Sequence, residues 1–105
     1  MEIKDKIKNL ISEHNICLFM KGTPDSPQCG FSMVVSNVLK HLNVKFKGIN
    51  VLEDENLRQG IKDYSDWPTI PQLYVQGEFI GGSDIVKELF ENGELKKLLE
   101  SKKLI

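Results

Sequence analysis

The chain lacks the features that several large classes of protein require. Its 105 residues carry 14 basic and 15 acidic side chains, so the net charge of −1 provides no basic excess for nucleic acid or an anionic membrane surface. No hydrophobic run approaches the length of a membrane span. The N-terminal segment is charged and amphipathic, without an apolar signal core. We therefore expect a cytoplasmic protein, or the mature form of one whose presequence has been removed.

Cysteine is also scarce. The two cysteines, Cys17 and Cys29, are not expected to form a structural disulfide in a reducing compartment. Cys17 lies in the apolar run 16–20, which is typical of a strand buried on both faces, and a free cysteine there acts as a small hydrophobic residue. The length supports one hydrophobic core, and no linker or repeat divides the chain. We expect a single domain over residues 1–105.

Hydrophobic spacing predicts the order of helices and strands. The expected elements are a helix over 3–11, a strand over 16–20, a helix over 29–41, a strand over 44–51, a helix capped by Asp54, a hairpin turning at 76–77 and a last helical region interrupted by Gly93. A helix joins the first two strands, so they should be parallel, whereas the hairpin pair is antiparallel. The sequence predicts an α/β fold, a four-stranded mixed sheet flanked by helices on both faces.

Cys29 is the residue best suited to carry chemistry. Apolar residues follow it at helical spacing, at positions 31, 34, 35, 38, 39 and 42, and so place it in the first turn of a helix. Free backbone N–H groups and the positive end of the helix dipole favour a thiolate there. The position three residues on is Ser32, so the chain offers no neighbouring second thiol. Cys29 therefore needs an external sulfur partner or a metal, unless it is only a structural residue.

Four segments carry a family resemblance. They are Lys21-Gly22-Thr23-Pro24, Pro27-Gln28-Cys29-Gly30-Phe31-Ser32, Trp67-Pro68-Thr69-Ile70-Pro71-Gln72 and Gly81-Gly82-Ser83-Asp84. In this order and spacing they resemble the monothiol glutaredoxins of the C-G-F-S class, over almost the whole chain. The resemblance implies a thioredoxin-like fold, glutathione binding and a [2Fe-2S] cluster that bridges a homodimer. It further implies delivery of the cluster to apo iron–sulfur proteins, or its sharing with a BolA-type protein.

The same resemblance implies a role for Cys29 as both the reactive thiol and the metal ligand. A [2Fe-2S] cluster takes four ligands. One Cys29 per subunit would supply two, and two glutathione sulfurs would supply the others. Ser32 cannot trap Cys29 in an intramolecular disulfide, although it is equally compatible with a plain first-turn residue.

Three cations are implied to face the glycine carboxylate of glutathione: Lys21, Arg58 and Lys62. Lys21 follows the first strand, close to the start of the Cys29 helix, and Arg58 and Lys62 are four residues apart on one helical face. The alternative for each of the three is a solvated surface side chain.

The resemblance also implies a backbone part of the glutathione site. Ile70 would precede a cis proline, Pro71, and pair with the cysteine moiety of glutathione like an added strand. Ser83 and Asp84 would open a helix whose N-terminus holds the γ-glutamyl carboxylate, with Asp84 meeting the amine. The alternatives are an ordinary trans turn at Ile70-Pro71 and a simple N-cap at Ser83 or Asp84.

Three functions compete. The first, which the resemblance favours, is an iron–sulfur carrier with at most weak enzymatic turnover. The second is a glutathione-dependent thiol–disulfide oxidoreductase that removes glutathione from mixed disulfides through Cys29. The third is an adaptor that senses cluster status through a BolA-type partner.

Overall fold

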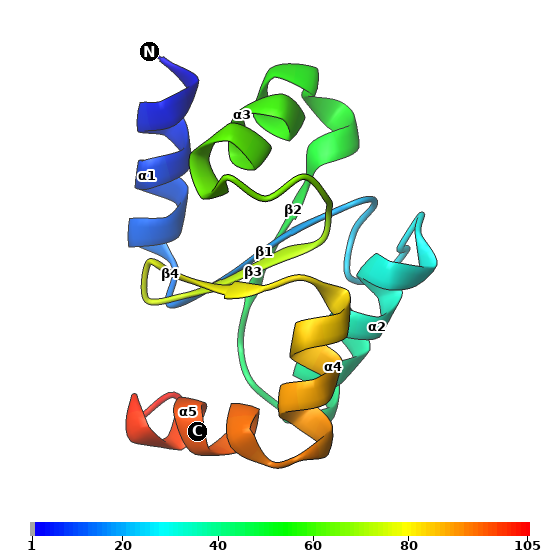
Figure 1. Cartoon of the computed structure of the whole chain (residues 1–105), viewed down its shortest axis with the longest axis vertical. Helices are drawn as coiled ribbons and strands as arrows, with labels where there is room; N and C mark the ends of the chain where they lie inside the picture. The colour runs from blue at the N-terminus through cyan, green and yellow to red at the C-terminus, as the bar shows by residue number, and fades with distance from the viewer. Residues whose placement is uncertain (1) are drawn as a thin grey trace.

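The computed structural model describes residues 2–105 as a sheet between two layers of helices (Figure 1). In chain order the elements are α1 (Ile3–Glu13), β1 (Ile16–Met20), α2 (Gly30–His41), β2 (Lys47–Asn50), the 3-10 helix η1 (Val51–Glu53), α3 (Glu55–Ser65), β3 (Gln72–Val75), β4 (Glu78–Gly81), α4 (Ser83–Glu91) and α5 (Glu94–Ser101). The expected order is confirmed, and Gly93, with φ 81°, divides the last helical region into α4 and α5. Within residues 2–105, no helix has the length and apolar character needed to cross a bilayer.

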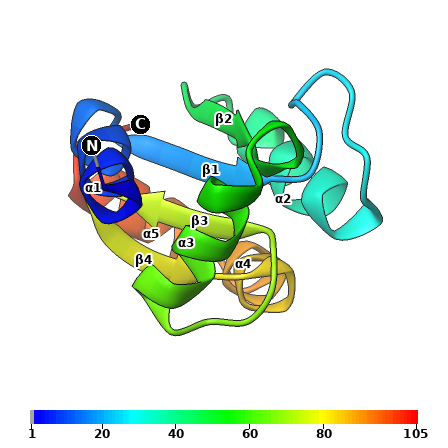
Figure 2. The same ribbon diagram turned by 90° about the horizontal axis from the view of Figure 1, so that it is seen from above.

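The four strands form one mixed sheet in the order β2-β1-β3-β4 (Figure 2). β1 and β2 run parallel, with Cys17 opposite Lys47, while β3 is antiparallel to both β1 and β4. The parallel pair is joined through α2, and the antiparallel pair by the tight turn at 76–77, as the sequence predicts. β1 is therefore central, and the chain leaves it directly into the segment that precedes Cys29.

The sheet divides the interior into two cores, and its inner strand β1 contributes to both. All five residues of β1 are buried, and alternate side chains point to opposite faces of the sheet. Ile16, Leu18 and Met20 pack with apolar residues of α2, α4 and α5. Cys17 and Phe19 pack with residues of α1 and α3. Figure 1 shows the same division, with α1 and α3 on one side of the sheet and α4 and α5 on the other.

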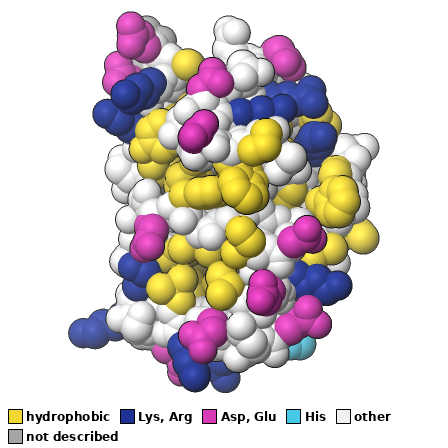
Figure 3. Space-filling model, viewed as in Figure 1, with side chains coloured by type: hydrophobic (Ala, Val, Ile, Leu, Met, Phe, Trp, Pro, Cys, Tyr) yellow, Lys and Arg dark blue, Asp and Glu magenta, His cyan; other side chains and the backbone are white. Residues whose placement is uncertain are grey.

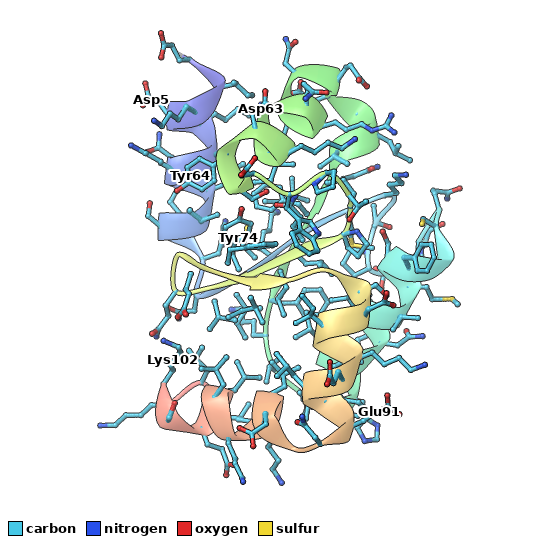
Figure 4. The ribbon with its side chains drawn as sticks, viewed as in Figure 1. Asp5, Asp63, Tyr64, Tyr74, Glu91 and Lys102 are labelled. Atoms are coloured by element: carbon cyan, nitrogen blue, oxygen red, sulfur yellow. The ribbon has the colours of Figure 1, made fainter. Side chains whose placement is uncertain are left out.

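Aromatic rings fill the core beneath α3. The ring of Tyr74 in β3 meets Phe19 edge-on at a centroid distance of 5.6 Å and lies 5.3 Å from Phe79. Tyr64 of α3 lies 6.3 Å from the same ring, and Figure 4 shows the two tyrosines in the space between α3 and the sheet. This cluster fixes α3 above the strands and therefore fixes the position of its cationic residues.

One local expectation is wrong: the second strand begins at Lys47 instead of residue 44. Val44 is buried by a different route: its N–H donates to the Leu39 carbonyl after a left-handed Asn43, so the segment folds back on α2 without pairing to β1. In α2, Phe31 shares the helical apolar spacing but is 62% exposed, and the buried apolar residues of this helix begin at Val35.

Candidate functional site

Cys29 is the residue immediately before α2. Its backbone is extended, with φ −147° and ψ 134°, and Gly30 is the first helical residue. The thiol makes no capping hydrogen bond of standard geometry, but it lies close enough to the helix start for its pKa to be lowered. The N–H of Ser32 is the largest cause, partial burial opposes it, and the N–H of Phe31 and the charge of Lys21 add to the lowering. Cys29 therefore favours the thiolate, the form that attacks disulfides and binds metal.

Ser32 connects the start of α2 to the end of β1. Its side chain is fully buried, and its Oγ accepts a hydrogen bond of 3.0 Å from the N–H of Lys21. The predicted proximity of Lys21 to the Cys29 helix is thus present in the structure. Ser32 is more than a first-turn residue, since it holds the strand exit against the helix that carries the reactive sulfur.

The loop between Lys21 and Cys29 has a defined shape. Gly22 and Pro27 form an isolated antiparallel bridge, and the N–H of Gln28 donates to the carbonyl of Lys21 at 2.9 Å. Gly22 has φ 92°, and a side chain there would collide with the backbone of Gln28, so only glycine fits this position. The loop delivers Cys29 in a fixed direction relative to β1.

A pocket of about 210 Å³ lies between the start of α2, the corner before β3 and the start of α4. It is lined by Phe31, Trp67, Thr69, Ile70, Pro71, Gly82, Ser83, Asp84 and Ile85. Three of the predicted site residues, Ile70, Ser83 and Asp84, therefore lie together. The Ile70–Pro71 peptide bond is cis. Neither the N–H nor the C=O of Ile70 has a hydrogen-bond partner within residues 2–105, so both remain available to a ligand.

The corner before β3 is held by a buried glutamine. Gln72 is fully buried, and its Nε2 donates to the carbonyls of Trp67 and Thr69, both at 3.2 Å. Its Oε1 accepts from the hydroxyl of Tyr74, also at 3.2 Å. The two Nε2 bonds tie the 67–71 segment to β3, and the Tyr74 bond holds the glutamine side chain in place, which together give the Ile70 backbone a fixed orientation in the pocket wall.

The start of α4 forms the opposite wall. Gly82 is the N-cap, so the alternative that Ser83 or Asp84 caps the helix is wrong; both lie in the first turn. Gly81, with φ 151°, has no space for a side chain, because a Cβ would lie 2.8 Å from Ile85. These glycines let the strand turn directly into α4 and bring the free N–H groups of its first turn to the pocket.

Arg58 and Lys62 lie apart from this pocket, on α3. They share one face of that helix, and both are half-buried. The Nε of Arg58 is buried without a hydrogen-bond partner among residues 2–105, and its ion pair with Glu55 is long, at 3.7 Å. The guanidinium is thus only weakly engaged by the protein, whereas a carboxylate would satisfy it better.

Cys29 is not part of a preformed metal site. Within residues 2–105, no group of three or more histidine, cysteine or acidic side chains is arranged to hold a metal ion. Cys17 is fully buried, and its burial raises the pKa to about 12, opposed only in part by the charge of Lys47. Cys17 therefore supplies neither a ligand nor a resolving thiol, and any further sulfur at Cys29 must come from another molecule.

Similarity to known proteins identifies the family of this chain. The sequence profile of the glutaredoxin family matches residues 16–80. A protein of Synechocystis described as an uncharacterized monothiol glutaredoxin, ycf64-like, is 54% identical over 99 residues, which are 94% of this chain and 92% of that protein. The chain belongs to the monothiol glutaredoxins. A probable monothiol glutaredoxin 2 of Rickettsia typhi is 55% identical over 94 residues, covering 90% of this glutaredoxin and 85% of the relative.

The solved structures agree with the fold. Reduced apo GrxS14 of poplar is 50% identical, covers 96% of both chains and superposes with a TM-score of 0.84. A buckwheat glutaredoxin–glutathione complex has a TM-score of 0.86 at 21% identity, which shows the shared thioredoxin-like fold. Some relatives are longer: this glutaredoxin spans 57% of the chloroplastic monothiol glutaredoxin-S14 of Arabidopsis thaliana and 40% of monothiol glutaredoxin-4 of Schizosaccharomyces pombe.

Sequence reasoning missed part of the pocket wall. Phe31, Thr69 and Ile85 line it, yet none of the three is among the predicted site residues. Their positions depend on three segments that meet only in the folded chain. The one available signal was Phe31 itself, a large apolar residue in a first turn directly after a reactive cysteine.

Proposed function

We propose that this glutaredoxin carries a [2Fe-2S] cluster between two copies of itself, with glutathione as co-ligand, and transfers it to apo iron–sulfur proteins. The observation that carries the proposal is an accessible Cys29 with a lowered pKa and, within residues 2–105, no second ligand beside it. A cluster held by one protein thiolate per subunit needs two more sulfurs. Because glutathione can dissociate, such a site releases its cargo more readily than four protein ligands would.

The surroundings of Cys29 suit glutathione. The free N–H and C=O of Ile70 match the peptide backbone of the tripeptide, in the manner of an added strand. The first turn of α4, with Ser83 and Asp84, suits an α-amino acid end, because its N–H groups favour a carboxylate and Asp84 favours an amine. Lys21, together with Arg58 and Lys62 of α3, supplies the cations for the other carboxylate.

The surface around the site suits a second copy or a BolA-type partner. Phe31 is 62% exposed, Met33 46% and Ile85 37%, all on the first turns of α2 and α4. Figure 3 shows hydrophobic side chains gathered across the middle of this face, with charged side chains mainly toward its upper and lower ends. A patch of this kind, beside a ligand-deficient cysteine, fits an interface that closes when the cluster binds.

Anaerobic reconstitution with iron, sulfide and glutathione tests the proposal. The expected product is a coloured dimer by size-exclusion chromatography, which disappears in Cys29→Ser and persists in the matched variant Cys17→Ala. Replacing glutathione with a thiol that lacks its carboxylates should abolish the dimer. A cluster that assembles equally well in Cys29→Ser would overturn the proposal, as would one that assembles without glutathione.

A second candidate function, glutathione-dependent reduction of mixed disulfides, is favoured by the lowered pKa of Cys29. Its thiolate would attack the glutathione sulfur of a glutathionylated protein and release that protein as a thiolate, which takes up a proton. A second glutathione would then attack the Cys29–glutathione disulfide, giving oxidised glutathione and free Cys29. Rapid turnover of a glutathionylated peptide by the colourless monomer, combined with no cluster after reconstitution, would favour this function over the carrier.

A further inference from the structure

Asn50 joins two segments that the proposed function needs to hold together. It is the last residue of β2, and in the parallel pair it lies opposite Met20. Met20 is the residue immediately before Lys21. Its Oδ1 accepts two hydrogen bonds of 3.0 Å, from the N–H of Gly22 and from the N–H of Leu52. The Leu52 bond is local and caps η1, whereas the Gly22 bond spans 28 positions of the chain.

Each bonded segment carries cations toward the site. Gly22 directly follows Lys21, whose charge contributes to lowering the pKa of Cys29. Leu52 lies in η1, which leads through the N-cap Asp54 into α3 and so to Arg58. A single amide oxygen therefore connects the loop that bears the first cation to the segment that bears the second.

We propose that Asn50 is a positioning residue of the glutathione site, which holds the Lys21 loop and the segment before Arg58 in one fixed arrangement. The inference rests on the proposed glutathione binding. Long cationic side chains can share one carboxylate at low entropic cost only if the backbones that carry them are already fixed. A local cap alone would not require the bond to Gly22, and a shorter capping side chain would not reach it.

Two substitutions separate the two bonds. Asn50→Ser keeps a good cap for η1, but its hydroxyl is too short to reach Gly22 as well. Asn50→Ala loses both. Asn56→Ala is the matched control, because Asn56 is an exposed asparagine in the first turn of α3 whose side chain forms no hydrogen bond within residues 2–105.

The measurement is a ratio of two reaction rates of Cys29. Oxidised glutathione reacts with the thiolate to give the Cys29–glutathione disulfide and one glutathione thiolate. Bis(2-hydroxyethyl) disulfide reacts in the same way but offers no carboxylate or amine to the site. The rate with oxidised glutathione divided by the rate with the small disulfide therefore reports glutathione recognition, independently of thiol reactivity. A role confined to stability would change both rates together and leave the ratio unchanged.

We expect Asn50→Ser and Asn50→Ala to lower this ratio about three- to tenfold, the effect of losing one or two ordinary hydrogen bonds. Asn56→Ala should stay within about twofold of the unmodified protein on the same scale. Circular dichroism checks the fold, and if Asn50→Ala does not fold, Asn50→Ser decides. A folded Asn50→Ser with an unchanged ratio overturns the inference and leaves the proposed function intact. A ratio in the unmodified protein no higher than in its urea-unfolded form overturns both.

Discussion

Two buried serines on one helix provide a direct test of how the site is built. Ser32 and Ser36 are both fully buried in α2, four residues apart. The Oγ of Ser32 accepts the N–H of Lys21, whereas the Oγ of Ser36 has no hydrogen-bond partner within residues 2–105. Substitution to alanine removes the same single oxygen at each place, so the loss of volume is equal and the difference reports the hydrogen bond.

Ser32→Ala should lower the free energy of unfolding by about 1–3 kcal/mol, because the N–H of Lys21 is left without its partner in a partly buried position. Ser36→Ala should be neutral or stabilising by up to about 1 kcal/mol, since it removes an unsatisfied buried hydroxyl. For a domain of this size, each kcal/mol corresponds to a change of about 4–8 °C in Tm. The two variants should therefore differ clearly.

Urea unfolding followed by the fluorescence of Trp67, the single tryptophan, measures both changes. A second readout is the thiolate absorbance of Cys29 against pH. Ser32→Ala should raise the pKa of Cys29 only slightly, because the larger cause of its lowering is the backbone N–H of Ser32, which alanine retains. Equal destabilisation by the two substitutions would refute the reasoning, as would a Ser36→Ala variant less stable than Ser32→Ala.

In the folded protein, iodoacetamide should alkylate Cys29 and leave the buried Cys17 unmodified, so mass spectrometry should find one adduct in buffer and two in urea; two adducts in buffer would contradict the assignment. Lys6 and a backbone N–H lower the pKa of Asp54, so its contribution to stability is complete above its unfolded-state pKa and is lost as the pH falls through the folded-state value. Asp54→Asn should flatten the acid side of the stability profile below about pH 4, and a profile of unchanged shape would count against this ion pair. Gly81→Ala should destabilise the protein by about 1–3 kcal/mol, since its φ of 151° is strained for alanine, and urea unfolding with no loss would show that the turn adapts.

Most of the fold follows from local patterns. The all-apolar β1, the helical spacing after Cys29 and the turn at 76–77 predict the parallel and hairpin pairs and the two helical layers, because each signal is repeated over several residues. The strand order β2-β1-β3-β4 is known only from the structure. Asp54 was predicted as a cap and is one: its side chain accepts the N–H of Leu57. These predictions needed only the neighbours along the chain.

The site is less predictable because its residues meet through tertiary contacts. The sequence identifies Cys29 and its thiolate, since both depend on a helix start. It does not indicate that the side chain of Ser32 turns inward to Lys21, or that Asn50 reaches Gly22. Helical spacing also does not separate Phe31, which is 62% exposed, from the apolar residues of the same helix that are buried from Val35 onward.

The partial exposure of the Cys29 sulfur has a consequence for how peroxide damages the protein. Stepwise oxidation to a sulfinic acid would begin at the Cys29 sulfur, since the other cysteine, Cys17, is buried in β1. The damaged side chain leaves the interior packing untouched, because the buried part of α2 starts beyond it. An inactivated molecule would keep its shape and its apolar face, and would therefore compete with intact copies for the partners of the proposed function instead of being removed as unfolded.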